Sequence, residues 1–305
     1  MAAARILHVD EHDNGVTGAQ LALAFSPMVM AALGRRTLGN SAPRLSMVAG
    51  LVRDRPSATL GDAFDAAHAL LAHGYRSEYV FKNALVSKIV YGRHSPATAT
   101  ALVEQQMGNS VADLMVVNGT STAYEIKTDL DQFVRLDAQL ADYCSRAERV
   151  YVVTSESRAA AAAARAPHHV GVIGLRSNGS LAMVRIADSN MERLQHDHLF
   201  TMLRTGELKT LLRRTHDLVP VTHMVQALDQ MRAAFRELDI ERAHAEALMQ
   251  LRGRGSSTAQ LTTVGPFPTS LRALAYTGEH SRVGAARIRE RLDSPAALFV
   301  GVDAV

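Results

Sequence analysis

The pattern of hydrophobic and polar positions divides the chain into helical and strand-like stretches. Apolar residues recur at helical spacing in 60–73 and 77–91, and Gly74 and Gly92 follow as stop signals. The next stretches are short, rich in β-forming residues and separated by turn-forming residues. They cover residues 101–106, 111–117 and 122–128. This change of period predicts two helices followed by three strands.

Helices and strands alternate further along the chain. Residues 130–146 and 157–165 have helical patterns, and 150–154 is an apolar run typical of a strand buried on both faces. Residues 170–175 and 181–186 flank the turn sequence Ser-Asn-Gly-Ser and predict a final hairpin. The order of elements predicts an α/β fold with helices packed on a mixed sheet.

The same pattern suggests four regions. We expect a helix-leaning N-terminal region, a central α/β domain, a helical region, and a linker with a poorly defined tail. Their bounds are 1–59, 60–190, 191–251 and 252–305. The Leu and Met residues after Glu192 fit a homodimer interface, and they fit an intramolecular core equally well.

Composition narrows the class of protein. Apolar residues make up 47% of the chain, which can bury a sizeable core without disulfides or structural metals. The single cysteine, Cys144, excludes a disulfide scaffold and indicates a reducing compartment. We see no signal peptide, no apolar run long enough to cross a membrane, and no Walker loop. We therefore expect a soluble, cytoplasmic protein with no membrane partner.

The charge is distributed unevenly. The formal net charge is +3, and only four of the 33 basic residues are lysines. The surplus lies in the two ends of the chain, whereas 60–190 is slightly acidic. The densest basic stretch contains Arg35, Arg36, Arg44, Arg53 and Arg55. These arginines could contact DNA phosphates, or they could simply form a charged helical surface.

Three residues carry the candidate chemistry. Glu125 and Lys127 lie two apart in a predicted strand and therefore project from the same face. If the preceding hairpin loop is 118–120, Asp113 lies directly opposite Glu125. Two carboxylates at that spacing repel each other unless a cation lies between them, and Mg²⁺ prefers oxygen ligands. A loop of another length would separate the two acids and remove the site.

Two alternatives remain open. A Glu-x-Lys triplet can arise by chance, and the chain contains a second copy in Glu207 and Lys209. That copy lies in a helical context, where residues two apart diverge, so we interpret it as a solvated helix surface. For the strand copy, the alternative is a surface ion pair on a hairpin.

An aspartate on one strand and Glu-x-Lys on the next, after a helix with a glutamate, resemble the PD-(D/E)xK nuclease superfamily. The spacing is most similar to Holliday-junction-resolvase-like members, and Glu78 matches their helical glutamate. Gln139-Leu-Ala-Asp-Tyr143 resembles a RecB-type motif, and the segment Tyr124–Leu140 resembles a poorly characterised bacterial and phage branch. The resemblance covers about 75–187. The superfamily's proline before the aspartate is Ala112 here.

This resemblance implies a restriction-endonuclease-like α-β-β-β-α-β core with a mixed sheet, flanked by helical N- and C-terminal regions. It also implies an endonuclease or exonuclease that hydrolyses DNA with Mg²⁺, for which Mn²⁺ substitutes. Asp113, Glu125 and the Ile126 carbonyl would bind the metal, and Lys127 would orient or deprotonate the attacking water. Such nucleases serve DNA repair, recombination or phage–host conflict, and they often form homodimers.

Other residues have a structural alternative. Glu78 would complete the metal site, or it would pair with Lys82 four residues later, and Glu104 is its rival as third carboxylate. Gln139 and Tyr143 could support the site from one helical face, and Tyr143 fits the core equally well. The alternative for the whole chain is a DNA-binding or assembly module that keeps the fold without cutting.

Overall fold

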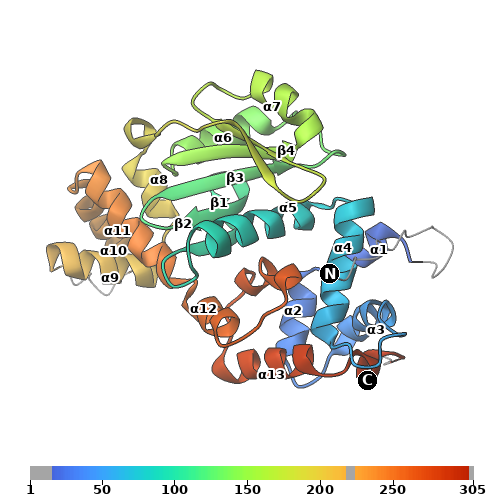
Figure 1. Cartoon of the computed structure of the whole chain (residues 1–305). Helices are drawn as coiled ribbons and strands as arrows, with labels where there is room; N and C mark the ends of the chain where they lie inside the picture. Colours follow the sequence, from blue (N-terminus) through green and yellow to red (C-terminus); the bar gives the residue numbers. More distant parts are fainter. Residues whose placement is uncertain (1–15, 218–223, 302–305) are drawn as a thin grey trace.

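The computed structural model describes residues 16–217 and 224–301 of the chain. A six-stranded sheet lies at its centre, with helices on both faces (Figure 1). In spatial order the strands are β1 (Thr100–Met107), β2 (Ser110–Val117), β3 (Ser121–Lys127), β4 (Arg149–Ser155), β5 (Gly171–Leu175) and β6 (Leu181–Arg185). The α/β class and the six strands predicted from the sequence are confirmed.

The sheet is mixed because its connections differ in length. β1, β2 and β3 form an antiparallel meander, and β5 and β6 form an antiparallel hairpin. β3, β4 and β5 are parallel and are joined by the crossover helices α6 (Leu136–Cys144) and α7 (Ala159–Arg165). The apolar run in β4 is buried along its length, as expected for a central strand covered on both faces.

Helix α5 (Glu78–Leu85) covers one face of the sheet and continues as a π-helical segment over Val86–Arg93, and α4 (Leu60–Gly74) packs against α5. Thr59 caps α4, because its hydroxyl accepts from the Asp62 N–H at 3.1 Å while its own N–H donates to Asp62 Oδ2 at 2.8 Å. The predicted start of this helix is therefore confirmed. Leu114, Tyr124 and Ile126 belong to the core beneath these helices.

The opposite face is covered by α6, α7 and a group of helices from the region after Glu192. That group consists of α8 (His196–Thr201), α9 (Thr205–His216), α10 (Met224–Arg236) and α11 (Ile240–Gly253). Their large apolar side chains, among them Leu211, Met231 and Phe235, are buried in one core with sheet residues such as Val152. Of the two roles expected for these side chains, they fill the intramolecular core. Among the described helices, none is both long and apolar enough to span a membrane.

The two ends of the described chain form a helical lobe, defined as residues 16–59 and 256–301 (Figure 1). Its helices are α1 (Gly18–Ala22), α2 (Pro27–Gly34), α3 (Ala42–Gly50), α12 (Ser256–Thr263) and α13 (Arg282–Asp293). α13 lies against α2, and Arg291 donates to the carbonyl oxygens of Ala32 and Leu33 at 2.8 and 3.0 Å. The expected linker and poorly defined tail are instead helical, because Ile288 and Leu292 find their apolar partners near the other end of the chain.

The helix expected over 130–146 begins only at Leu136. Thr128 and Asp131 form a turn after β3, in which the Thr128 N–H and hydroxyl donate to Asp131 Oδ2 at 2.8 and 2.7 Å. Such side-chain bonds offer the backbone an alternative to helical hydrogen bonds. The segment between Lys127 and α6 is therefore a hydrogen-bonded loop, which leaves Leu130 and Val134 exposed.

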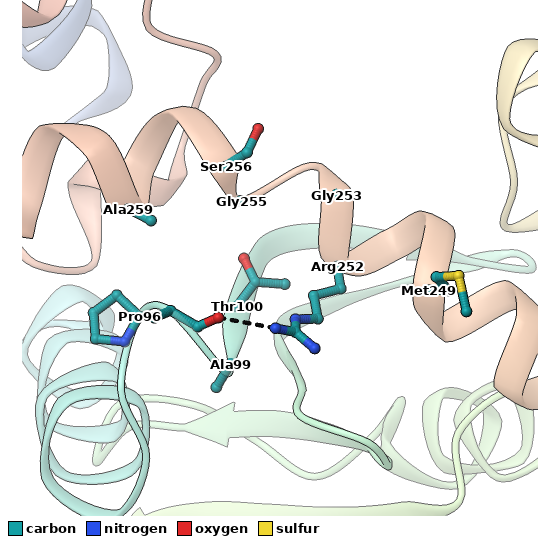
Figure 2. Close-up of a pocket in the computed structure, with 10 residues that line it drawn as sticks. Pro96, Ala99, Thr100, Met249, Arg252, Gly253, Gly255, Ser256 and Ala259 are labelled. Atoms are coloured by element: carbon teal, nitrogen blue, oxygen red, sulfur yellow. Dashed lines mark hydrogen bonds between the residues drawn. The ribbon is translucent and has the colours of Figure 1, made fainter.

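The turn between α11 and α12 packs closely against the start of β1. Figure 2 shows this region, where a cavity of about 440 Å³ is lined by residues of both segments. Arg252 donates to the Ala97 carbonyl at 2.9 Å, which fastens the end of α11 to the loop before β1. A Cβ atom on Gly255 would lie 1.7 Å from Thr100 Oγ1. Only glycine therefore fits at this turn.

We predict that Gly255→Ala lowers the free energy of unfolding by about 1–3 kcal/mol, because the added methyl group forces Thr100 and α12 apart. Gly253→Ala is the matched control, since its Cβ would meet nothing within 4 Å at the end of α11. The control should leave stability unchanged or raise it by about 0.4–1 kcal/mol. Urea unfolding of both variants measures the difference, and equal midpoints would contradict the close packing.

Candidate active site

The hairpin formed by β2 and β3 has the loop on which the site prediction depended. Val117 pairs with Ser121 across residues 118–120, and the Asn118 N–H donates to the Thr120 carbonyl at 3.1 Å. Gly119 supports the tight turn with a φ of +96°. The loop therefore has the three residues that the site hypothesis required.

The backbone ladder between these strands ends one residue before the acids would pair. Leu114 opposite Tyr124 is the last pair, and the Asp113 carboxylate accepts from the Ile126 N–H at 2.7 Å. The aspartate thus replaces a backbone acceptor where β2 separates from β3. This arrangement differs from the directly opposed pair that we expected, and it holds the Asp113 carboxylate beside the residue that follows Glu125.

The alternation of side chains along β2 breaks at the same point. Ala112 and Met115 belong to the core under α6, whereas Leu114 belongs to the core under α5. On β1 the ladder skips Glu104, which has a left-handed φ of +55°. A non-glycine residue in this conformation costs free energy, and such residues cluster at functional sites. Asp113 therefore lies at an irregular position between two groups of charged residues.

The first group lies on the α6 side of the sheet. Lys127 Nζ donates to Glu125 Oε1 at 2.5 Å and to Gln139 Oε1 at 3.0 Å. The hydroxyl of Tyr143 lies 2.7 Å from Glu125 Oε2 and 2.7 Å from the Val111 carbonyl. Glu125, Lys127 and Tyr143 are all buried. Two neighbours on one face of α6 thus hold both ends of the Glu-x-Lys pair.

The second group lies on the α5 side and contains both candidates for a third carboxylate. The buried Lys82 Nζ lies 2.6 Å from Glu78 Oε1 and 3.2 Å from Glu104 Oε1. The pairing of Glu78 with Lys82, which we considered as an alternative, is therefore present. The same ammonium group also brings Glu104 to Glu78, so both carboxylates border the site.

The charges of the two groups meet at Asp113. Burial and then the negative charges of Glu125 and Glu78 raise the pKa of Asp113 to about 8, although the Ile126 N–H and Lys82 oppose the shift. Burial would lower the pKa of Lys82, but the charges of Glu78, Asp113 and Glu104 raise it above its ordinary value. Too little positive charge therefore lies near Asp113 to stabilise its ionised form, because Lys82 and Lys127 already pair with glutamates.

Burial and the charge of Glu125 also raise the pKa of Tyr143, so its hydroxyl remains a hydrogen-bond donor. Within the part of the chain that the structure describes, no three or more His, Cys, Asp or Glu side chains are grouped as a metal site. The candidate metal ligands are therefore oxygen atoms of Asp113, Glu125 and the Ile126 carbonyl, and both Glu125 oxygens already accept from Lys127 and Tyr143.

A cavity of about 250 Å³ adjoins the second group of charges. Glu78, Lys82 and Glu104 contribute to its lining. The remainder of the lining includes apolar residues of the helical lobe, among them Phe25 and Leu274. The larger cavity of Figure 2 shares none of these residues and contains Arg252 as its one charged side chain. The smaller cavity is therefore the one that belongs to the site.

Lys82 was not predicted to lie between Glu78 and Glu104 or to act on the pKa of Asp113. The scarcity of lysine was an available signal, because two of the four lysines, Lys82 and Lys127, lie in this site. The residues of the helical lobe that line the cavity could not be recognised from the sequence, since they are ordinary apolar residues far from the site in the chain.

The five arginines of the densest basic stretch lie away from the candidate site. Arg35 and Arg36 follow α2, Arg44 lies in α3, and Arg53 and Arg55 follow α3 in the helical lobe, apart from the hairpin (Figure 1). Within 16–217 and 224–301, no acidic side chain forms an ion pair with any of the five.

The second Glu-x-Lys pair is only partly a solvated surface. Lys209 is exposed on α9, but Glu207 is half-buried and pairs with Arg254 at 2.6 Å. The prediction was wrong for Glu207, because α11 brings an arginine from a distant part of the chain onto α9.

Comparisons with known proteins relate the central part of the chain to a phage family. A family model described as bacteriophage P4 protein cII matches residues 72–264. Protein cII of enterobacteria phage P4 is 32% identical over 141 residues, which are 45% of this chain and 53% of that protein. The chain thus spans about half the length of this curated relative.

Among solved structures, a protein of unknown function from Silicibacter pomeroyi aligns with 42% of this chain and 87% of its own length. It has 16% sequence identity and a TM-score of 0.28. The match to a phage protein agrees with the phage kinship expected from the sequence. Because the family model covers well over half of the residues, this chain belongs to the bacteriophage P4 protein cII family.

Proposed function

We propose that this chain is a Mg²⁺-dependent deoxyribonuclease that hydrolyses phosphodiester bonds at Asp113, Glu125 and Lys127. The observation that carries the proposal is the buried Glu125 with the half-buried Asp113 beside it and a lysine on the same hairpin. A structural ion pair would balance its charges, whereas burial and Glu125 leave Asp113 with a strongly raised pKa. A site of this kind is suited to accept a cation.

The order of elements supports the resemblance to the PD-(D/E)xK superfamily. α5, β1, β2, β3, α6 and β4 follow one another as in the α-β-β-β-α-β core of restriction-endonuclease-like proteins. The glutamate of α5, the aspartate of β2 and the Glu-x-Lys of β3 fall on the corresponding elements. Ala112 in place of the superfamily's proline leaves this correspondence intact, since it lies on β2 just before Asp113.

The donor atoms fit a hard divalent cation. Asp113, Glu125 and the Ile126 carbonyl offer oxygen atoms, and Mg²⁺ in proteins is often held by one or two carboxylates with several waters. Glu78 and Glu104 are the candidates for a further carboxylate. Mn²⁺ accepts the same oxygen ligands. When bound, the metal would lower the pKa of a water and offset charge on the scissile phosphate.

Lys127, Gln139 and Tyr143 would have separate roles in the reaction. Lys127 Nζ donates to two acceptors, which favours its role in orienting the attacking water and in compensating phosphate charge over proton abstraction. Gln139 fixes the ammonium group, and Tyr143 fixes the second oxygen of Glu125. Gln139 and Tyr143 are positioning residues, because they act through Lys127 and Glu125.

DNA would be bound largely by residues outside the hairpin. The exposed arginines Arg35, Arg36, Arg53 and Arg55 and the half-buried Arg44 lie on the helical lobe. Their number, and the absence of ion pairs to them within the described residues, suit them to phosphates. The α/β domain itself is slightly acidic, so a purely local attraction of DNA to the hairpin is not expected.

The alternative is a DNA-binding or assembly module without catalysis. The observation that favours it is the closed hydrogen-bond network, in which Glu125 already contacts Lys127 and Tyr143. Both oxygen atoms of Glu125 are therefore engaged by the protein. A cleavage assay with matched variants separates the two functions.

We predict that the purified protein cleaves linear, supercoiled or branched DNA with Mg²⁺ and not with EDTA. Lys127→Ala and Asp113→Asn should each reduce the cleavage rate by about 100-fold or more, because the first removes a cation at the reacting phosphate and the second an anionic ligand of the metal. Lys209→Ala is the matched control, since Lys209 belongs to the exposed Glu-x-Lys copy on α9. Gel electrophoresis of the products measures the rates.

Cleavage that continues unchanged in Lys127→Ala and Asp113→Asn would show that the site assignment is wrong. DNA binding without cleavage under any metal condition would favour the non-catalytic module. Loss of cleavage in Lys209→Ala as well would indicate general damage to the fold and would remove the support from the other two variants.

The raised pKa of Asp113 also predicts a pH dependence of stability. Between about pH 4 and pH 8 the folded protein keeps a proton on Asp113 that the unfolded chain has released. Stability therefore falls as pH rises through this range. Asp113→Asn carries no such proton, so its stability relative to the natural protein should rise by on the order of 1–3 kcal/mol between pH 5 and pH 9.

Urea unfolding at pH 5, 7 and 9 in EDTA measures this difference. Asp229→Asn is the control, because Asp229 is exposed on α10 and should show a constant difference from the natural protein. Addition of Mg²⁺ at pH 8 should stabilise the natural protein and have little effect on Asp113→Asn. A difference for Asp113→Asn that does not change with pH would contradict the uncompensated charge.

A further inference from the structure

The cavity of about 250 Å³ beside Lys82 has two chemically distinct sides. One side carries the carboxylates of Glu78 and Glu104, whose side chains are 50% and 60% exposed. Phe25 and Leu274 of the helical lobe line the cavity with them. A flat group with an apolar ring and polar edges would satisfy both sides at once.

The polar side offers hydrogen-bond acceptors. Lys82 Nζ lies against Oε1 of each glutamate. Within the described residues, no hydrogen bond involves Oε2 of either Glu78 or Glu104. These two oxygens can therefore accept from N–H groups of a ligand. The same carboxylates repel a phosphate, so the charged backbone of a nucleic acid would not lie in this cavity.

We propose that the cavity binds an unpaired nucleobase of the DNA strand that is cut, and that it selects bases with an exocyclic amino group. This inference rests on the proposed nuclease function. Carboxylates are the side chains that accept hydrogen bonds from the amino group of cytosine. The volume is below that of a typical drug-sized pocket, about 300–1,000 Å³, and suits one ring system.

Only an unpaired base can reach this position. In a duplex the amino group and the ring face of a base are engaged in pairing and stacking, so entry requires a single strand or a base turned out of the helix. Glu104 connects the cavity to the candidate site, because the flanking pairs Val103–Leu114 and Gln105–Ala112 place it opposite Asp113. A base held against Glu78 and Glu104 would thus place a neighbouring phosphate beside the hairpin.

The two sides of the cavity come from different parts of the chain. Glu78, Lys82 and Glu104 lie within residues 72–264, which the family model matches. Phe25 and Leu274 lie outside that range. The helical lobe therefore completes a cavity whose acidic side lies in the region shared with the phage family, and base selection would depend on both.

Binding of short single strands in EDTA tests this inference without requiring cleavage. The probes are fluorescein-labelled ten-residue oligomers of deoxycytidine and of thymidine, measured by fluorescence anisotropy. We expect the deoxycytidine oligomer to bind about tenfold more tightly to the natural protein, because thymine has no amino group. Equal affinities for the two oligomers would overturn the inference.

Ala22→Trp should abolish this preference, because Ala22 lines the cavity and an indole would fill it. Leu23→Trp is the matched control, since the neighbouring Leu23 is 53% exposed and does not line the cavity. Thr277→Trp, at the opposite chain end of the lining, gives a second blocking variant if Ala22→Trp does not fold. A preference that survives in a folded blocking variant would overturn the inference.

The outcome is independent of the nuclease test. Selective binding that disappears in Ala22→Trp supports the base site even if Asp113→Asn leaves cleavage unchanged, in which case only the catalytic assignment fails. Mg²⁺-dependent cleavage that disappears in Asp113→Asn, together with equal binding of both oligomers, would keep the nuclease and reject the base site.

Discussion

The closeness of two carboxylates, the buried Glu125 and the half-buried Asp113, is the constraint around which the site is arranged. Buried charges are costly unless they are paired and hydrogen-bonded. Glu125 is provided with Lys127 and Tyr143, whereas Asp113 has the Ile126 N–H and a more distant lysine. The remaining imbalance raises the pKa of Asp113 to about 8. A divalent cation would offset this imbalance, which is the basis of the metal-dependent reaction that we propose.

This arrangement depends on an irregularity in the sheet, where regular strand pairing is interrupted at Asp113 and Glu104. The part of β2 that precedes Leu114 is not paired with β3, and β1 adopts a left-handed conformation at Glu104. These irregularities let α5 and α6 approach the same position from opposite faces of the sheet. Each helix contributes two polar residues that lie four positions apart and contact the site. On α5 these are Glu78 and Lys82, and on α6 they are Gln139 and Tyr143.

Much of the site could be predicted from the sequence because it depends on local periodicity. The strand period puts Glu125 and Lys127 on one face, the loop 118–120 sets the hairpin register, and the helical period puts Gln139 and Tyr143 together. The break at Asp113 could not be predicted, because a left-handed residue such as Glu104 is held in place by contacts distant in sequence.

The helical lobe escaped prediction for a similar reason. α13 has few apolar residues among its arginines, so its pattern alone does not indicate a buried helix. It is ordered because Ile288 and Leu292 pack in one core with residues near the start of the chain. Long-range packing of this kind also completes the cavity beside Lys82, which no single segment of sequence contains.

The central claim is that Asp113 and Glu125 form a binding site for a divalent cation. Anomalous diffraction from crystals soaked in Mn²⁺ tests it most directly, since the metal can be located without any assumption about the reaction. The account predicts an anomalous peak in contact with carboxylate oxygens of Asp113 and Glu125 and with the Ile126 carbonyl. Crystals with a clear Mn²⁺ peak elsewhere and none at these oxygens would contradict it.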